Sequence, residues 1–119
     1  MKELKIEVFG QEYRAKTSSF KKKLDTQLNF HVAWNTDEIL LPDDLESGKA
    51  VEEIFLALQE ALVGEYNLKE EDWVFFPEPN ESSRYFLSGL KKEQLPPEVL
   101  ANPVRYWYDH TDDVWRTHY

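Results

Sequence analysis

Cysteine is absent from the 119-residue chain. Its absence excludes disulfide bonds, thiolate nucleophiles and thiolate-ligated zinc or iron–sulfur sites. Because small secreted domains often depend on disulfides, a chain of this size without cysteine favours a cytoplasmic location. Long apolar runs are also missing, since the longest, Ile54 to Leu58, is far too short to cross a bilayer. Residues 1–9 alternate charged and apolar side chains, which is not the pattern of a signal peptide.

Glycine is scarce, and this removes several functional classes. The four glycines are isolated from one another, so no glycine-rich loop that cradles phosphate is present. The nucleophile elbow Gly-x-Ser-x-Gly is missing, as are the His-Glu-x-x-His zinc motif and the EF-hand loop. The sequence therefore predicts no cofactor, and no motif in it indicates a particular reaction.

Acidic residues are abundant, and they are concentrated in the middle of the chain. The formal net charge is −9. Residues 37–81 hold fourteen acidic and two basic residues, whereas residues 1–36 have a balance of +3 and residues 82–119 a balance of zero. A net negative charge repels nucleic acid and anionic lipid. We therefore expect neither direct nucleic-acid binding nor membrane binding.

The N-terminal segment has the pattern of a β-hairpin. Apolar residues alternate with charged ones over residues 3–9, with the period of two that is typical of a half-buried strand. Gly10-Gln11 has glycine first, as a type II′ turn requires. This turn predicts a register in which Val8 pairs with Tyr13, with both side chains on the apolar face.

Other segments show strand patterns. The polar residues 18–27 predict a loop or a short helical turn, and residues 104–119 predict a terminal hairpin that turns near Thr111-Asp112. Gly89 is expected to close the last strand before that hairpin. Alternation or a short apolar run predicts three more strands, at residues 28–34, 73–76 and 84–88.

One clear helix is expected at about residues 47–63, with Ser47 as its N-cap and Gly64 as its left-handed C-terminal residue. Its apolar stripe comprises Val51, Ile54, Phe55, Leu58, Ala61 and Leu62. The order of strands, helix and strands predicts a single α+β domain over residues 1–119. Its mainly antiparallel sheet would have about five to seven strands and carry the helix on one face.

The acidic residues around this helix are the first candidate binding surface. A dense array of carboxylates attracts a basic protein over long range and speeds association. The alternative is a solvated face that keeps the protein in solution. The candidates for partner binding are Asp37, Glu38, Asp43, Asp44, Glu46, Glu52, Glu53 and Glu60.

The aromatic C-terminus is the second candidate. The predicted hairpin register places Tyr108 opposite Trp115 and Trp107 opposite Arg116. Each face of this hairpin carries a tryptophan, so one large aromatic is expected to point outward. Since exposed Trp, Tyr and Arg are enriched at binding hot spots, we expect Trp107, Trp115, Arg116 and Tyr119 to contribute to a partner site.

Histidine and carboxylate near the terminal turn are the third candidate. His110, Asp112, Asp113 and His118 provide ligand types of zinc, manganese and non-haem iron sites. The predicted hairpin separates the two histidines by about 17 Å at ~3.3 Å per residue, and such residues also cap their own turn. The turn role is therefore favoured and no metal site is assigned. His31 is expected to be a lone surface histidine.

Three hypotheses for function follow. The leading one is a small acidic docking protein, such as an inhibitor or immunity-type protein, with a basic partner that is a nuclease or binds nucleic acid. The alternative is a small metal- or ligand-binding enzyme using His110, Asp112, Asp113 and His118. The third is a subunit of a larger assembly that makes contact through the C-terminal hairpin. Oligomeric state is left open.

Overall fold

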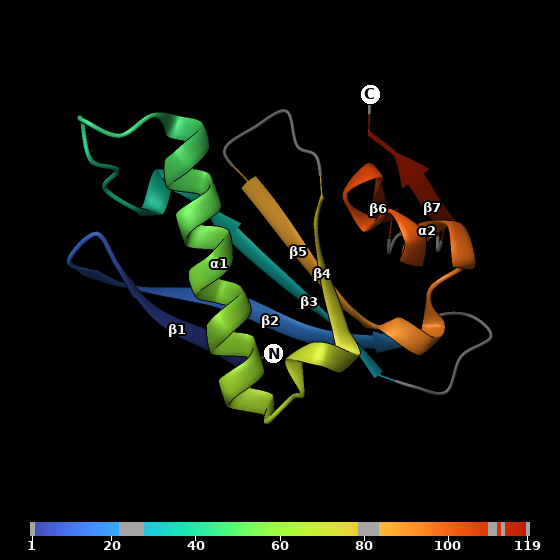
Figure 1. The fold of residues 1–119 in the computed structure, drawn as a ribbon. Coiled ribbons are helices and arrows are strands. Elements are labelled where there is room, and N and C mark those ends of the chain that lie inside the picture. Colours follow the sequence, from blue (N-terminus) through green and yellow to red (C-terminus); the bar gives the residue numbers. More distant parts are fainter. Residues whose placement is uncertain (1, 22–27, 79–83, 110–111, 113, 119) are drawn as a thin grey trace.

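The computed structural model describes residues 2–21, 28–78, 84–109, 112 and 114–118 (Figure 1). A five-stranded sheet has the order β1-β2-β3-β5-β4, and each neighbouring pair in it is antiparallel. Its strands are β1 (Lys2–Val8), β2 (Gln11–Lys21), β3 (Leu28–Asn35), β4 (Trp73–Glu78) and β5 (Arg84–Lys91). A second, two-stranded sheet pairs β6 (Tyr106–Asp109) with β7 (Val114–Thr117).

One long helix, α1 (Ser47–Tyr66), crosses the five-stranded sheet, and a short helix, α2 (Pro97–Ala101), precedes the second sheet (Figure 1). The α+β class, the antiparallel sheet and the single main helix are confirmed. Among the described residues, no helix is both long and apolar enough to cross a membrane. Four 3₁₀ turns connect these elements: η1 (Thr36–Glu38), η2 (Glu70–Asp72), η3 (Lys92–Gln94) and η4 (Pro103–Arg105).

The main core lies between α1 and one face of the sheet. Ile54, Leu58 and Leu62 recur every four residues on α1 and are completely buried there. Alternate residues of the strands supply the other side of this core. The sheet residues buried against α1 are Leu4, Ile6, Val8, Tyr13, Ala15, Phe30, Val32, Trp34, Trp73 and Leu87.

A second, smaller core lies on the opposite face of β4 and β5. Phe76 and Leu90 alternate with residues of the main core, and they pack against Leu95, Val99 and Tyr108. The C-terminal hairpin and α2 therefore cover the side of the sheet that α1 does not. Because β4 and β5 contribute to both cores, the two layers are joined through one sheet.

The first hairpin differs from prediction in its turn. Phe9 and Gly10 are its two central residues, and both have positive φ, 53° and 74°, as a type I′ turn requires. Val8 therefore pairs with Gln11, not with Tyr13. The predicted register was displaced by two residues along the partner strand, which leaves every side chain on its predicted face. The pattern of burial was consequently right although the pairing was wrong.

Both helix ends also differ from prediction. Glu46 occupies the N-cap position, with no side-chain capping bond, and Ser47 is the first helical residue. At the other end the helix continues through Gly64 to Tyr66. Asn67 then adopts the left-handed conformation at φ 54° and donates its backbone N–H to the Gly64 carbonyl. Asparagine tolerates this conformation better than other residues with a side chain, so it replaces glycine here.

Two strands are longer than predicted. β2 continues through Ser18 to Lys21, because β3 pairs with it from Lys16 to Lys21. β5 passes through Gly89 and ends at Lys91, because β4 pairs with it there. Pro77 lies within β4 and does not end it; β4 is an edge strand, where a missing N–H is tolerated.

Candidate functional site

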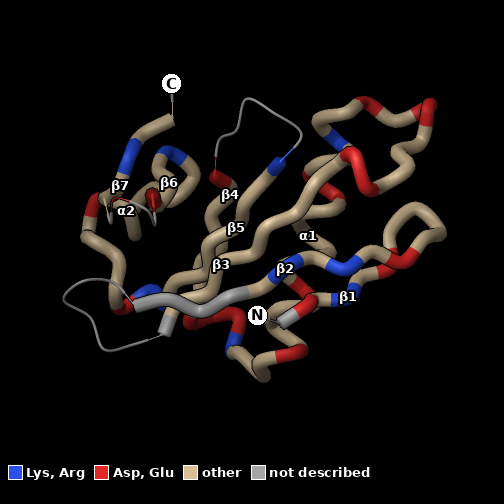
Figure 2. The backbone as a smooth tube through the Cα atoms, turned by 180° about the vertical axis from the view of Figure 1, so that it is seen from behind, with Lys and Arg blue, Asp and Glu red and all other residues tan. Residues whose placement is uncertain are grey.

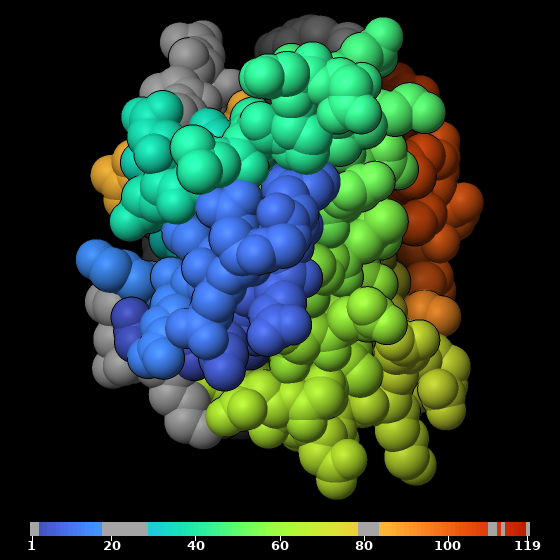
Figure 3. All heavy atoms as spheres, turned by 90° about the vertical axis from the view of Figure 1, so that its left-hand side faces the viewer, coloured from blue at the N-terminus to red at the C-terminus, as the bar shows by residue number. Residues whose placement is uncertain are grey.

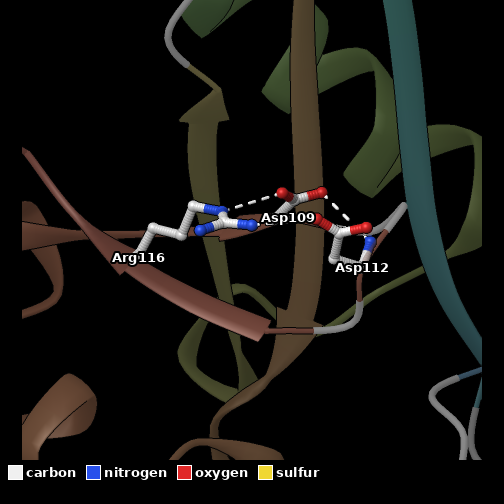
Figure 4. Close-up of polar contacts among 3 residues, drawn as sticks. All are labelled: Asp109, Asp112 and Arg116. Atoms are coloured by element: carbon white, nitrogen blue, oxygen red, sulfur yellow. Dashed lines mark hydrogen bonds and ion pairs between the residues drawn. The ribbon is translucent and has the colours of Figure 1, made fainter.

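The C-terminal hairpin has the predicted register, with Trp107 opposite Arg116 and Tyr108 opposite Trp115. Figure 4 shows how Asp109 organises its turn. One carboxylate oxygen of Asp109 accepts the backbone N–H of Asp112 at 3.2 Å, and the other accepts Nε of Arg116 at 2.8 Å. The bond between Arg116 and Asp109 favours the charged guanidinium and raises the pKa of Arg116. The turn-capping role predicted for this segment is confirmed for Asp109.

The metal alternative involves four residues, of which the structure describes Asp112 and His118. Asp112 uses Oδ2 to accept Arg116 at 2.9 Å, and His118 is exposed. His110 and Asp113 lie outside the described residues. Within the part of the chain that the structure describes, no group of three His, Asp or Glu residues could hold a metal ion. A metal or acid–base role for this segment stays a prediction.

The hairpin aromatics divide between core and surface. Trp115 points inward and makes edge-to-face contacts with Phe76 and Tyr108, each at 5.1 Å between ring centroids. Trp107 lies on the other face of the hairpin and is half-buried. Because Trp107 is half-buried, the exposure of a large aromatic on this hairpin stays a prediction. Tyr119 lies outside the described residues.

His31 is not the surface histidine that its polar strand face suggested. Only 9% of its surface is exposed, because β3 is an interior strand with neighbours on both sides. The imidazole stacks on Phe86 at 5.1 Å, and its Nε2 lies 3.7 Å from Oε2 of Glu78. Alternation alone could not distinguish this second buried face from a solvated one.

Ser88, His31 and Glu78 share that face, and their residue types resemble a hydrolytic triad. Ser88 is the direct cross-strand partner of His31. The serine hydroxyl, however, is fully buried and makes no hydrogen bond with the described part of the chain. Nucleophilic catalysis requires a base bonded to the nucleophile and access for a substrate. The arrangement provides neither, so we assign it no catalytic role.

The predicted acidic residues are all exposed; seven lie before α1 or in its N-terminal half, and Glu60 lies in its C-terminal half. Figure 3 shows the segment before α1 beside the helix and the β1–β2 hairpin on one side of the molecule. Lys49 is the only basic residue between Thr36 and Tyr66. In the described part of the chain, no ion pair involves Asp43, Asp44, Glu46, Glu52, Glu53 or Glu60.

The acidic residues of α1 do not share one flank. At ~100° per residue, Glu53 and Glu60 lie close together in projection along the helix axis, whereas Glu52 is turned away from both. Glu60 borders a shallow hollow beside β1, and Glu52 borders a groove on the opposite flank. The carboxylates therefore surround α1 and do not form a single flat face.

Two basic residues of the first hairpin, Lys5 and Arg14, pair with the same glutamate of that hairpin. Figure 2 shows blue and red alternating along β1 and β2. Lys5 Nζ lies 3.0 Å from Glu12, and Nε of Arg14 lies 3.2 Å from the other oxygen of the same carboxylate. These cations lower the pKa of Glu12. Both cations are therefore engaged within the hairpin.

An apolar groove, which sequence analysis did not predict, lies between the N-terminal half of α1 and the paired ends of β4 and β5. Its volume is about 380 Å³. Trp34 and Tyr85 stack at 4.7 Å within it, and Leu56 on its rim is 51% exposed. The signal in the sequence was Leu56, a large apolar residue outside the core stripe of the helix.

Comparison of the chain with protein-family models, with curated proteins and with solved structures finds no match. Any function must therefore be argued from the residues and their geometry.

Proposed function

We propose that this protein is a docking domain that binds a basic protein through the carboxylates around the N-terminal half of α1. One observation carries the proposal: these side chains are exposed, and those of Asp43, Asp44, Glu52 and Glu53 make no ion pair with the described part of the chain. Uncompensated carboxylates create a negative potential that raises the rate of encounter with a positive surface.

The partner class follows from this charge. Nucleases and other nucleic-acid-binding proteins present basic grooves, in which carboxylates can occupy the positions of phosphates. The domain would then act as an inhibitor or immunity-type protein and would not contact nucleic acid itself. We place this action in the cytoplasm, where a chain without cysteine needs no oxidising compartment.

Capture of the partner tests the proposal. The protein is used as bait in a lysate of its native host, at low salt and at about 0.5 M salt, where the screening length is about 4 Å. A basic protein should be retained at low salt, released at high salt, and lost when Asp43, Asp44, Glu52 and Glu53 are changed to lysine.

A matched variant controls for net charge. Glu70, Glu71, Asp72 and Glu98 are exposed but lie outside the N-terminal half of α1, and changing them to lysine alters the total charge by the same amount. The proposal expects this variant to retain the partner, with an affinity within a few-fold of the unmodified protein. Equal loss in both variants would reduce the effect to net charge and contradict a specific acidic site.

A further inference from the structure

The groove beside α1 has the features of an anchor pocket. Val51, Phe55 and Leu56 form its helical wall, and Trp34 and Tyr85 form its floor on the sheet. A volume of about 380 Å³ lies within the range of pockets that bind ligands, roughly 300–1,000 Å³. Leu56 adds a large, half-exposed apolar side chain to the rim.

The charges at the groove are of one sign. Among the described residues that line it, Glu52 and Glu78 are the charged ones. Glu52 is exposed at the rim, while Glu78 also faces His31 on the other side of the sheet edge. An occupant must therefore offer an apolar group to the floor and positive charge to the rim. A neutral apolar ligand would leave the Glu52 carboxylate unmatched.

We infer that this groove receives a large apolar side chain from the basic partner, flanked there by Lys or Arg. The inference rests on the proposed function and specifies how docking occurs. The carboxylates around α1 attract and orient the partner, and the groove supplies the buried anchor. Interfaces commonly combine a central apolar or aromatic hot spot with a charged rim. The groove combines the apolar side chain of Leu56 with the carboxylate of Glu52 on its rim.

Short peptides test the inference without knowledge of the partner. The probes are blocked pentapeptides Lys-Lys-Xaa-Lys-Lys, where Xaa is Trp, Leu or Ala, and the corresponding Glu-Glu-Trp-Glu-Glu. Each is titrated into ¹⁵N-labelled full-length protein, and the backbone amide shifts are followed by NMR. The Trp and Leu peptides should shift the amides of Val51, Phe55, Leu56 and Tyr85. They should bind roughly 10- to 100-fold tighter than the Ala peptide, the ratio that burial of one large side chain provides.

Matched variants locate the contact. Leu56→Gln should remove most of the advantage of the Trp peptide, whereas Leu100→Gln, at a position of similar exposure (48%) on α2, should preserve it. Glu52→Gln should weaken the Lys-flanked Trp peptide by about two- to fivefold, and Glu53→Gln, on the other flank, should weaken it less. Both leucines are half-exposed, so neither change threatens folding.

Several outcomes would overturn the inference. Equal affinity for the Trp and Ala peptides, or shifts confined to amides away from the groove, would show that the groove provides no anchor. Equal binding of the Glu-flanked peptide would contradict selection for a basic segment. Shifts of the groove amides on dilution without peptide would identify a second copy of the chain as the occupant.

The two proposals can fail separately. If capture depends on Asp43 and Asp44 but no peptide enters the groove, the docking function stands and the anchor is wrong. If the peptides bind as expected but no basic partner is captured, the groove is a recognition site and the acidic docking function is wrong.

Discussion

The phenol of Tyr13 donates a hydrogen bond of 3.0 Å to Oε1 of Glu38, 25 residues further along the chain. The same phenol oxygen accepts the backbone N–H of Asn35, also at 3.0 Å. Nearby, the side-chain amide of Gln11 makes two hydrogen bonds with the backbone of Leu40. The first hairpin therefore holds the start of the acidic segment that precedes α1. Glu38 consequently has a structural role besides any part in docking.

Tyr13 gives the protein a specific sensitivity to alkaline pH. Burial, with a smaller contribution from Glu38, raises the pKa of Tyr13 from 10.0 to about 12. Between these values the folded protein retains a proton that the unfolded chain loses, so stability must fall as pH rises. Unfolding in urea at pH 8 to 12 should show this decrease above about pH 10, and Tyr13→Phe should reduce it. A tyrosinate absorbance titration without a late-titrating tyrosine would contradict the assignment.

Removal of the Tyr13 hydroxyl should also lower the free energy of unfolding at neutral pH. Tyr13→Phe keeps the buried ring but leaves the Asn35 N–H and the Glu38 carboxylate without this partner. We expect a loss of about 1–2 kcal/mol in the free energy of unfolding, measured in urea at pH 7. Glu38→Gln retains an acceptor oxygen and should cost less. A larger loss in Glu38→Gln than in Tyr13→Phe would show that the hydroxyl is not the linking group.

Asp109 should dominate the stability of the C-terminal turn. Asp109→Ala removes both the acceptor for the Asp112 N–H and the partner of Arg116. Loss of such a turn-capping bond typically costs roughly 1–2 kcal/mol. Asp109→Asn keeps an oxygen for the backbone N–H and should retain most of that stability. Hydrogen exchange at Asp112 reports the turn directly, and equal exchange in both variants would contradict the capping role.

Ser88 should be dispensable for stability. Its hydroxyl is buried and makes no hydrogen bond in the structure, so Ser88→Ala removes a desolvated polar group and little else. We expect unchanged stability or a gain of up to about 1 kcal/mol. Thr17→Val should behave alike, because its hydroxyl is also buried without a partner. A loss of more than about 1 kcal/mol in Ser88→Ala would indicate a hidden hydrogen bond.

The spacing of apolar residues predicted those helices and strands that bury only one face. The i, i+4 series of Ile54, Leu58 and Leu62 and the alternation of Leu4 and Ile6 each report a single apolar face, so α1 and the first hairpin were predictable. The type of turn was not, because Gly10 suits a type I′ turn with Phe9 as well as a type II′ turn with Gln11. The structure chooses the former by giving Phe9 a positive φ.

The candidate sites were less predictable, because they depend on how the layers sit against one another. The exposure of the acidic residues could be expected from their charge alone. The groove could not, since it forms where α1 meets the Trp34 and Tyr85 end of the sheet, and these segments are distant in sequence. The burial of His31 likewise depends on neighbouring strands that are distant in sequence.

Gly89 provides a final test of the packing on β5. A Cβ at this position would lie 3.0 Å from Cε1 of Phe75 and 3.6 Å from Cδ2 of Leu62. Gly89→Ala should therefore lower the free energy of unfolding by about 1–3 kcal/mol, the usual cost of overpacking. Gly64→Ala is the matched control, because it lies inside α1 with nothing within 4 Å, and it should gain about 0.5–1 kcal/mol from helix propensity.

The partner of the clash can be identified by a double variant. Phe75→Leu alone should destabilise the protein, but in the Gly89→Ala background it should remove the overlap with the ring. We therefore expect the double variant to lose less than the sum of the two single losses, with a coupling of about 1 kcal/mol in urea unfolding. Additive losses would mean that Phe75 moves aside freely, and that glycine at position 89 is not required by the ring that crosses it.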